Sequence, residues 1–539
     1  MKRNLLLFSF LFMIGFFASL STLQAKGGQG IAYYNAGFPI SAKSLLLDEL
    51  TSEPANLDET CFYLGNIYFG ENLPDSASVY FTKGITANSL SALNAIGLAM
   101  LKIKSNPLVA TQEIDAVLKI KKNKKNPDLY IAAARAFLTN GVVDKATFYH
   151  DKALDVKSKY APTAVLLGDI YLAKNDVGNA CRNYEMAVLY DATCKEAYIK
   201  YARAYRNVNT ALAIEMLGKL KVQDPSFLLV DKEMADIYYA TNEFDKAAQL
   251  YETFLKSGNS NVQDLTKYAM TLFLNHDFVK SLEVTNLGLQ KSPRNPAFNR
   301  LAMYNNVDLK KYPEALAAAD SFFNKSEKPD LSYLDYRYFG QALRETQQYD
   351  SAIVQYQKAL KLDSSKVELW KDISAMYDAK SDYPNSILAY TNYINALGAE
   401  KKTADDIIAL GKIYYNQGTD SIPLAEKKIA LLKADSLFAQ VVAIEADNYR
   451  GNFWRARANS ALDPETTQGL AKPFYELTVT YILSKEDPRY NSILVECYSY
   501  LGYYFLVKKD NKTSKTFWSK ILVLDPENET AKKAIEGIK

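Results

Sequence analysis

The fold is decided by residues 333–366, which read YLDYRYFGQALRETQQYDSAIVQYQKALKLDSSK. Counted from Tyr333 as position 1, this stretch has large residues at positions 4, 7, 11 and 24 and small residues at positions 8, 20 and 27. These residues are Tyr336, Phe339, Leu343, Tyr356, Gly340, Ala352 and Ala359. Positions 4 to 11 share one face of a first helix, and positions 20 to 27 share one face of a second helix. The spacing therefore predicts two helices that approach closely at the small residues while the large side chains fill the groove.

The small residue of position 8 recurs along nearly the whole chain. It is found at Gly65, Gly97, Ala134, Gly168, Ala202, Ala235, Ala269, Met303 (or Ala302), Gly340, Ser374, Gly411, Ala458 and Gly502. Six of the intervals have nearly the same length, and this regular spacing resembles the tetratricopeptide repeat, a two-helix unit of about 34 residues. The resemblance implies an all-α solenoid of stacked helix-turn-helix units, each of which packs only on its neighbours.

The register of the repeat divides the chain into four predicted segments. Residues 1–25 are expected to be a signal peptide, and residues 26–402 a regular repeat array. From Gly411 to Ala458 the interval is 47 residues, and from Ala458 to Gly502 it is 44 residues. We therefore expect residues 403–491 to form irregular repeats with longer helices or an inserted turn. Residues 492–539 are expected to form a regular terminal repeat and a charged capping helix.

Residues 1–25 read MKRNLLLFSFLFMIGFFASLSTLQA. Two basic residues precede an apolar run that ends before a small residue, Ala25, which is the pattern of a secretory signal peptide. The alternative is an uncleaved membrane anchor. No cysteine suited to lipid attachment lies near Ala25, and no later stretch is apolar enough to span a membrane. The sequence predicts an exported chain that begins near Lys26.

The segment NFWRARANSALDPETTQGLAKPFYE, residues 452–476, is similar to one found in exported repeat proteins of Gram-negative envelopes. The similarity carries no known activity. Together with the predicted signal peptide, it leads us to expect a protein of the periplasm, or one associated with the outer membrane, of a Gram-negative bacterium.

The composition argues against several classes of function. The 64 Lys and Arg nearly balance the 61 Asp and Glu, and this gives no electrostatic footprint for nucleic acid. The two histidines, His150 and His276, are isolated, and the four cysteines form no CxxC pair, so neither a metal site nor another cofactor is expected. The chain has no P-loop, GxSxG or HExxH motif. We therefore predict a protein without enzymatic activity.

The resemblance implies a scaffold that binds protein or peptide partners on a concave face. In the family, positions 2, 5, 9 and 12 of the first helices face this groove. Two alternatives remain open from the sequence. One is a glycan- or peptidoglycan-binding repeat protein of the periplasm or outer membrane, and the other is an enzyme with a site hidden in residues 403–491.

Position 9 alternates in charge over four consecutive repeats. The residues are Arg135, Asp169, Arg203 and Asp236. We expect equivalent positions of neighbouring first helices to face each other, so that these side chains form a self-neutralising ladder of ion pairs. The alternative is that Arg135 and Arg203 contact a partner. Lys200 and Arg206 add positive charge one turn either side of Arg203, and they are the better candidates for partner contacts because neither has an evident carboxylate partner at its own position.

Overall fold

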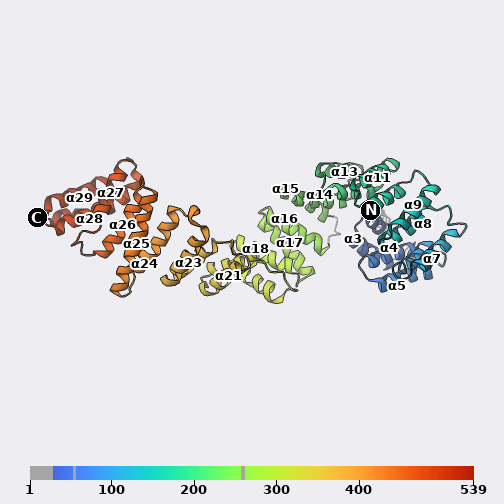
Figure 1. Ribbon diagram of the computed structural model, residues 1–539, viewed down its shortest axis with the longest axis horizontal. Coiled ribbons are helices and arrows are strands. Elements are labelled where there is room, and N and C mark those ends of the chain that lie inside the picture. The colour runs from blue at the N-terminus through green and yellow to red at the C-terminus, as the bar shows by residue number, and fades with distance from the viewer. Residues whose placement is uncertain (1–27, 52–55, 257–260, 539) are drawn as a thin grey trace, which may run out of the picture. The chain divides into compact units, whose positions relative to one another are not determined.

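The computed structural model describes residues 28–51, 56–256 and 261–538, drawn as ribbon in Figure 1. In these ranges the chain forms 29 α-helices and no strand, which confirms the predicted all-α architecture. The predicted signal peptide lies outside the described residues. Within them, no helix combines the length and the apolar character that crossing a membrane requires. Two compact units divide the chain between Asn305 and Asn306.

In the first unit, each first helix is followed by a second helix across a short connection. The pairs are α2 (Gln29–Asn35) with α3 (Pro39–Thr51), α4 (Leu57–Gly70) with α5 (Pro74–Ala87), α6 (Ala92–Met100) with α7 (Pro107–Lys119), α8 (Pro127–Thr139) with α9 (Val143–Val156), α10 (Ala161–Ala173) with α11 (Val177–Tyr190), α12 (Lys195–Tyr205) with α13 (Thr210–Gln223), α14 (Leu229–Ala240) with α15 (Phe244–Leu255), and α16 (Val262–Leu274) with α17 (Phe278–Lys291). The division between the units falls inside α18 (Pro296–Asp308).

The second unit continues the pattern from α19 (Tyr312–Asp320), which ends in a π-helical turn, η1 (Ser321–Lys325). Its pairs are α20 (Tyr333–Glu345) with α21 (Tyr349–Leu362), α22 (Leu369–Ala379) with α23 (Tyr383–Leu397), α24 (Ala404–Thr419) with α25 (Leu424–Ile444), α26 (Tyr449–Leu462) with α27 (Lys472–Leu483), and α28 (Asn491–Val507) with α29 (Asn511–Leu524). The short 3₁₀ helices η2 (Ala399–Lys401) and η3 (Pro488–Tyr490) lie between pairs, and α30 (Glu529–Gly537) comes last.

Ten of these hairpins turn through the same backbone conformation. In each, the residue two places after the first helix ends has a φ between 56° and 80°. These residues are Gly37, Asn72, Gly141, Asn175, Asn242, His276, Lys310, Gln347, Ser381 and Lys509. Only two of the ten are glycines, so the turn accepts side chains of several kinds although its conformation is left-handed.

The small residue of position 8 lies under an aromatic ring of the second helix. A Cβ atom added to Gly168 would lie 2.4 Å from the ring of Tyr184, and one added to Gly340 would lie 2.6 Å from the ring of Tyr356. Both rings belong to position 24 of the same repeat. Because glycine has no Cβ atom, the two helices approach closely, and the ring fills the groove between them.

The same contact explains how the longer repeat is accommodated. Gly411 and Phe438 are farther apart in the sequence than Gly340 and Tyr356, yet a Cβ at Gly411 would lie 2.4 Å from the Phe438 ring. The extra residues lie in the two helices themselves, since α24 has 16 residues and α25 has 21. Longer helices therefore account for the longer interval, and the contact between glycine and ring is kept.

We expect Gly340→Ala to destabilise the chain locally. The new methyl group would overlap the ring of Tyr356, and overpacking of this kind costs about 1–3 kcal/mol. Hydrogen exchange should accelerate in α20 to α23 and change little elsewhere, because a solenoid couples only neighbouring units.

Gly218→Ala is the control, because Gly218 also lies within a helix but has open space around its Cβ position. This substitution should stabilise α13 slightly, since alanine favours helix. A uniform rise in exchange over the whole chain for Gly340→Ala would contradict the nearest-neighbour account.

Candidate functional site

A cavity of about 740 Å³ lies in the first unit. Its walls come from six consecutive first helices, α2, α4, α6, α8, α10 and α12. The lining includes the groove positions that the repeat pattern implied, such as Glu59 and Phe62 on α4 and Asp128, Ile131 and Arg135 on α8. First helices line a common inner surface because each repeat stacks on the next in the same orientation.

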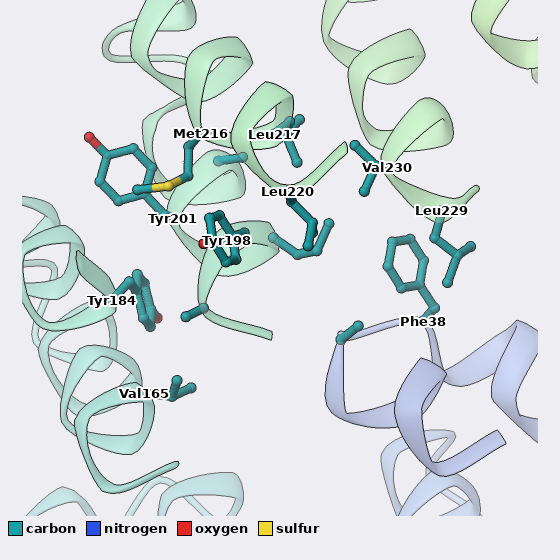
Figure 2. Packing of buried hydrophobic residues seen from close by; sticks show 14 of the residues in the cluster. Phe38, Val165, Tyr184, Tyr198, Tyr201, Met216, Leu217, Leu220, Leu229 and Val230 are labelled. Carbon is teal, nitrogen blue, oxygen red and sulfur yellow. The ribbon is translucent and has the colours of Figure 1, made fainter. Parts of the chain in front are cut away.

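The cavity is closed on one side by the N-terminal hairpin, α2 and α3. This hairpin contacts α12 and the start of α14, which come much later in the sequence. The ring of Tyr33 packs edge-on against Phe227, with the ring centroids 5.8 Å apart. Figure 2 shows the side chain of Phe38 beside Leu229 and Val230 at the start of α14, and all three residues belong to one buried cluster. The first unit thus forms a closed turn of the solenoid around the cavity.

Four charged side chains meet on one wall of the cavity, from α8, α10 and α12. Arg135 Nη2 lies 2.8 Å from Glu196 Oε1, and Lys200 Nζ lies 2.5 Å from Asp169 Oδ2 and 2.9 Å from the same Glu196 oxygen. The hydroxyl of Tyr184 donates to Asp169 Oδ1 at 2.9 Å. Arg135 Nε is buried and has no hydrogen-bond partner within the described residues.

Burial and ion pairing act in opposite directions on these groups. Burial alone would raise the pKa of Glu196, but Arg135 and Lys200 hold that pKa below its ordinary value. Burial alone would lower the pKa of Lys200, but Asp169 and Glu196 hold that pKa above its ordinary value. The cluster is therefore fully charged at neutral pH and compensates its own charge.

The alternating charges of position 9 do form ion pairs, but not with one another. Three of the four pair with position 6 of the following repeat: Asp169 with Lys200, Arg203 with Glu233, and Asp236 with Lys267, at 2.5, 2.6 and 2.8 Å. Arg135 pairs instead with Glu196, two repeats farther along. The expectation that equivalent positions face each other is wrong, because stacked first helices are offset by about one helical turn at their contact. The expected neutralisation nevertheless holds for these three pairs.

The structure separates the four predicted contact residues. Lys200 and Arg135 line the cavity. No carboxylate partner was evident for Lys200 at its own repeat position, but in the structure Lys200 pairs with Asp169 and Glu196, which stand at other positions. Arg203 is not among the lining residues and instead contacts Glu233 and the N-terminal hairpin. Arg206 is exposed at the end of α12, with no ion pair in the described part of the chain.

Negative charge prevails where α4 faces α8. Asp58, Glu59 and Asp128 are close enough that, after burial, the other two carboxylates raise the pKa of Glu59. None of the three forms an ion pair with a lysine or arginine in the described residues, although Tyr160 donates a hydrogen bond to Asp128 Oδ1 at 2.7 Å. Glu59 was not among the predicted contact residues, although it stands at position 2 of its repeat.

Aromatic rings complete the lining near these carboxylates. The rings of Tyr34 and Tyr63 pack edge to face with centroids 5.1 Å apart, and Phe62 lies against Tyr63 at 5.4 Å. Burial raises the pKa of Tyr63 to about 12, so its hydroxyl stays protonated at neutral pH. The cavity therefore offers apolar faces, neutral hydroxyl groups and carboxylates that lack a cationic partner.

The acidic pair Asp405 and Asp406 has structural partners. Asp406 accepts hydrogen bonds from the backbone and side chain of Thr403, forming the capping box of α24, and Asp405 lies 2.5 Å from Arg450. In the described part of the chain, no three His, Cys, Asp or Glu side chains are grouped so that they could hold a metal ion.

A protein-family model with the description TPR repeat matches residues 340–373. The match confirms that this stretch is a tetratricopeptide repeat, as its spacing predicted. Among solved structures the chain is similar to the C-terminal part of a TPR repeat-containing protein from Cytophaga hutchinsonii, with 29% identity, 50% of this chain and 99% of that chain covered, and a TM-score of 0.42.

Two further solved structures are similar in the same way. A tetratricopeptide repeat protein from Parabacteroides merdae has 15% identity, with 46% of this chain and 98% of that chain covered and a TM-score of 0.31. The pilF protein of Pseudomonas aeruginosa has 16% identity, with 41% and 98% covered and a TM-score of 0.33. No curated protein matched the chain.

We expect Glu196→Gln to destabilise the first unit by about 2–3 kcal/mol, because Arg135 and Lys200 would lose the carboxylate that they share. The native pKa of Glu196 is lowered, so its contribution is present above the ordinary glutamate pKa and is lost as the pH falls through the lowered value. The stability difference between variant and parent should therefore shrink in acid.

Glu215→Gln is the matched control for thermal unfolding measured between pH 3 and 7. Glu215 also pairs with a lysine four residues later, but both side chains are more than half exposed, so its loss should hardly change the melting temperature. Equal effects of the two substitutions would contradict a buried, shared carboxylate.

Proposed function

We propose that this protein is a scaffold whose N-terminal cavity binds an extended segment of a partner protein. Tetratricopeptide repeat proteins generally serve as protein-interaction scaffolds. The cavity volume falls in the range of about 300–1,000 Å³ that is typical of ligand sites. The absence of catalytic motifs from the sequence supports a role in binding without chemistry.

The observation that carries the proposal is the lining of the cavity. Its charged lining comprises Glu59, Asp128, Asp169 and Glu196 against Arg135 and Lys200, so the carboxylates outnumber the cations by two. Asp169 and Glu196 are already compensated, whereas Glu59 and Asp128 are not. A lysine or arginine of a partner segment would relieve the repulsion at Glu59, and the neighbouring aromatic faces would receive its aliphatic stem.

The partner backbone would also find a donor in the cavity. Arg135 lines the cavity and its side chain is 30% exposed, while its Nη2 holds Glu196. A carbonyl group of an extended segment could accept from the exposed part of this guanidinium group without displacing the ion pair. We therefore propose that partner segments contain a basic side chain a few residues from the backbone carbonyl that Arg135 binds.

Glu59→Gln should raise stability and weaken binding. The pKa of Glu59 is raised in the folded chain, so its ionised form costs stability above that pKa, and the cost disappears in acid. We expect a higher melting temperature for the variant at pH 7 and none of this gain near pH 4, close to the ordinary glutamate pKa of about 4.3.

Binding is measured with a library of twelve-residue peptides on the full-length chain. Selected peptides should be rich in Lys and Arg, and Glu59→Gln should weaken them in a salt-dependent manner. Glu113→Gln is the control, since Glu113 lies on α7, outside the cavity lining, and pairs with Lys102. Peptides that bind Glu59→Gln and parent equally would contradict the proposed site.

We also propose that the chain is exported to the periplasm or the outer membrane of a Gram-negative bacterium. The support is the sequence of residues 1–25, with its basic start, apolar run and Ala25. The intact mass of the protein isolated from its native cells should correspond to a chain that starts at Lys26. A mass that includes Met1, or that includes an acyl chain, would contradict this proposal.

A further inference from the structure

Gly37 has a role that its turn does not explain. The equivalent turn position of eight other hairpins carries Asn, His, Lys, Gln or Ser with a similar positive φ, so this turn does not require glycine. What requires glycine is Arg203. A Cβ atom on Gly37 would lie 2.4 Å from Arg203 Nη1, which donates a hydrogen bond to the Gly37 carbonyl oxygen at 2.8 Å.

Arg203 is held in place for this contact by Glu233. Its Nε and Nη2 atoms lie 3.1 and 2.6 Å from the two carboxylate oxygens of Glu233, a paired arrangement that fixes the plane of the guanidinium group. The remaining nitrogen, Nη1, therefore points to Gly37, and the guanidinium carbon lies 4.6 Å from the centre of the Phe38 ring. We call these contacts of Gly37 and Phe38 with Arg203 the latch.

The latch is a different kind of contact from those that stack the repeats. Hairpin α2–α3 packs directly on α4, as any repeat packs on its neighbour. Its contact with α12 and α14 bridges 166 residues at the hydrogen bond between Arg203 and Gly37. It also includes two cation–π contacts, from Arg203 and Lys232 to the Phe38 ring, the Tyr33–Phe227 pair and the apolar surroundings of Phe38. Stacking contacts between α4 and α13 do not depend on it, because a solenoid is held by its neighbouring interfaces.

The hairpin is at the same time a wall of the cavity. Ile31, Tyr34, Asn35 and Gly37 line it from one side, and Glu196 and Lys200 of α12 from another. We propose that hairpin α2–α3 is a gate, which opens at the latch to admit a partner segment and closes over it. The role in partner entry depends on the proposed function, whereas the local opening itself does not.

Hydrogen exchange of the full-length chain without ligand tests the gate. The sharpest variant is Gly37→Ala, and Gly141→Ala is its matched control. Gly141 has a φ of 79° against 80° for Gly37 and stands at the same turn position, but nothing lies within 4 Å of its Cβ position. Both substitutions therefore carry the same backbone strain, and only Gly37→Ala disturbs Arg203.

Gly37→Ala should accelerate exchange in residues 29–51 by about tenfold or more, as expected for losing a hydrogen bond to a charged donor. Gly141→Ala should leave residues 29–51 unchanged, and protection of α4 to α13 away from the substituted turn should be the same in both variants. Phe38→Leu, which keeps an apolar side chain but removes the ring beneath Arg203, should produce the same local effect more weakly.

Two results would overturn the gate. One is exchange in residues 29–51 that is the same in Gly37→Ala and in the parent chain. The other is acceleration that spreads equally through α4 to α13, which would make the hairpin an inseparable part of the unit. Because no ligand is present, this outcome is independent of the peptide library: local opening without peptide binding would refute the proposed function and leave the gate standing.

Discussion

The structure depends on an aromatic ring that lies against a residue without a side chain. In the hairpins of Gly168 and Gly340, the ring of Tyr184 or Tyr356 occupies the space where a Cβ atom would stand. This contact fixes how closely the two helices of a repeat approach and so how each repeat presents its surface to the next. The all-α solenoid follows from repeating that approach along the chain.

Charge adds a second periodic contact on the inner surface of the first unit. Asp169 and Asp236 each accept a tyrosine hydroxyl from their own repeat and pair with a lysine of the following repeat. Between them Arg203 reverses the sign and pairs with Glu233. These pairs compensate one another. The cavity charges without an ion-pair partner are therefore the carboxylates of Glu59 and Asp128.

Much of this could be predicted from the sequence. The rest could not be predicted, for physical reasons. The spacing around Gly340 predicts the helix pairs because it reports a local contact within one repeat. The charge alternation predicts a ladder, but its register depends on the offset between stacked helices, which no spacing within a repeat encodes. The pairing of Lys200 with Asp169 was missed for that reason, whereas Glu196 stands four residues before Lys200 on the same helix and could have been found. The latch between Gly37 and Arg203 joins distant repeats. It could not be predicted because Gly37 stands at a turn position that looks like those of the other hairpins. Glu59 could have been found, since position 2 faces the groove in the resembling family.

The central claim is that partner segments enter the cavity of the first unit. Site-specific photo-crosslinking in native cells tests it most directly, with a photo-reactive phenylalanine analogue placed at position 62 or at position 148. Phe62 lines the cavity, whereas Phe148 is 48% exposed on the second helix α9 and lies outside the lining. The account predicts that position 62 captures a discrete partner segment containing a basic residue and that position 148 does not. Capture from position 148 alone would place the binding surface outside the cavity and contradict the account.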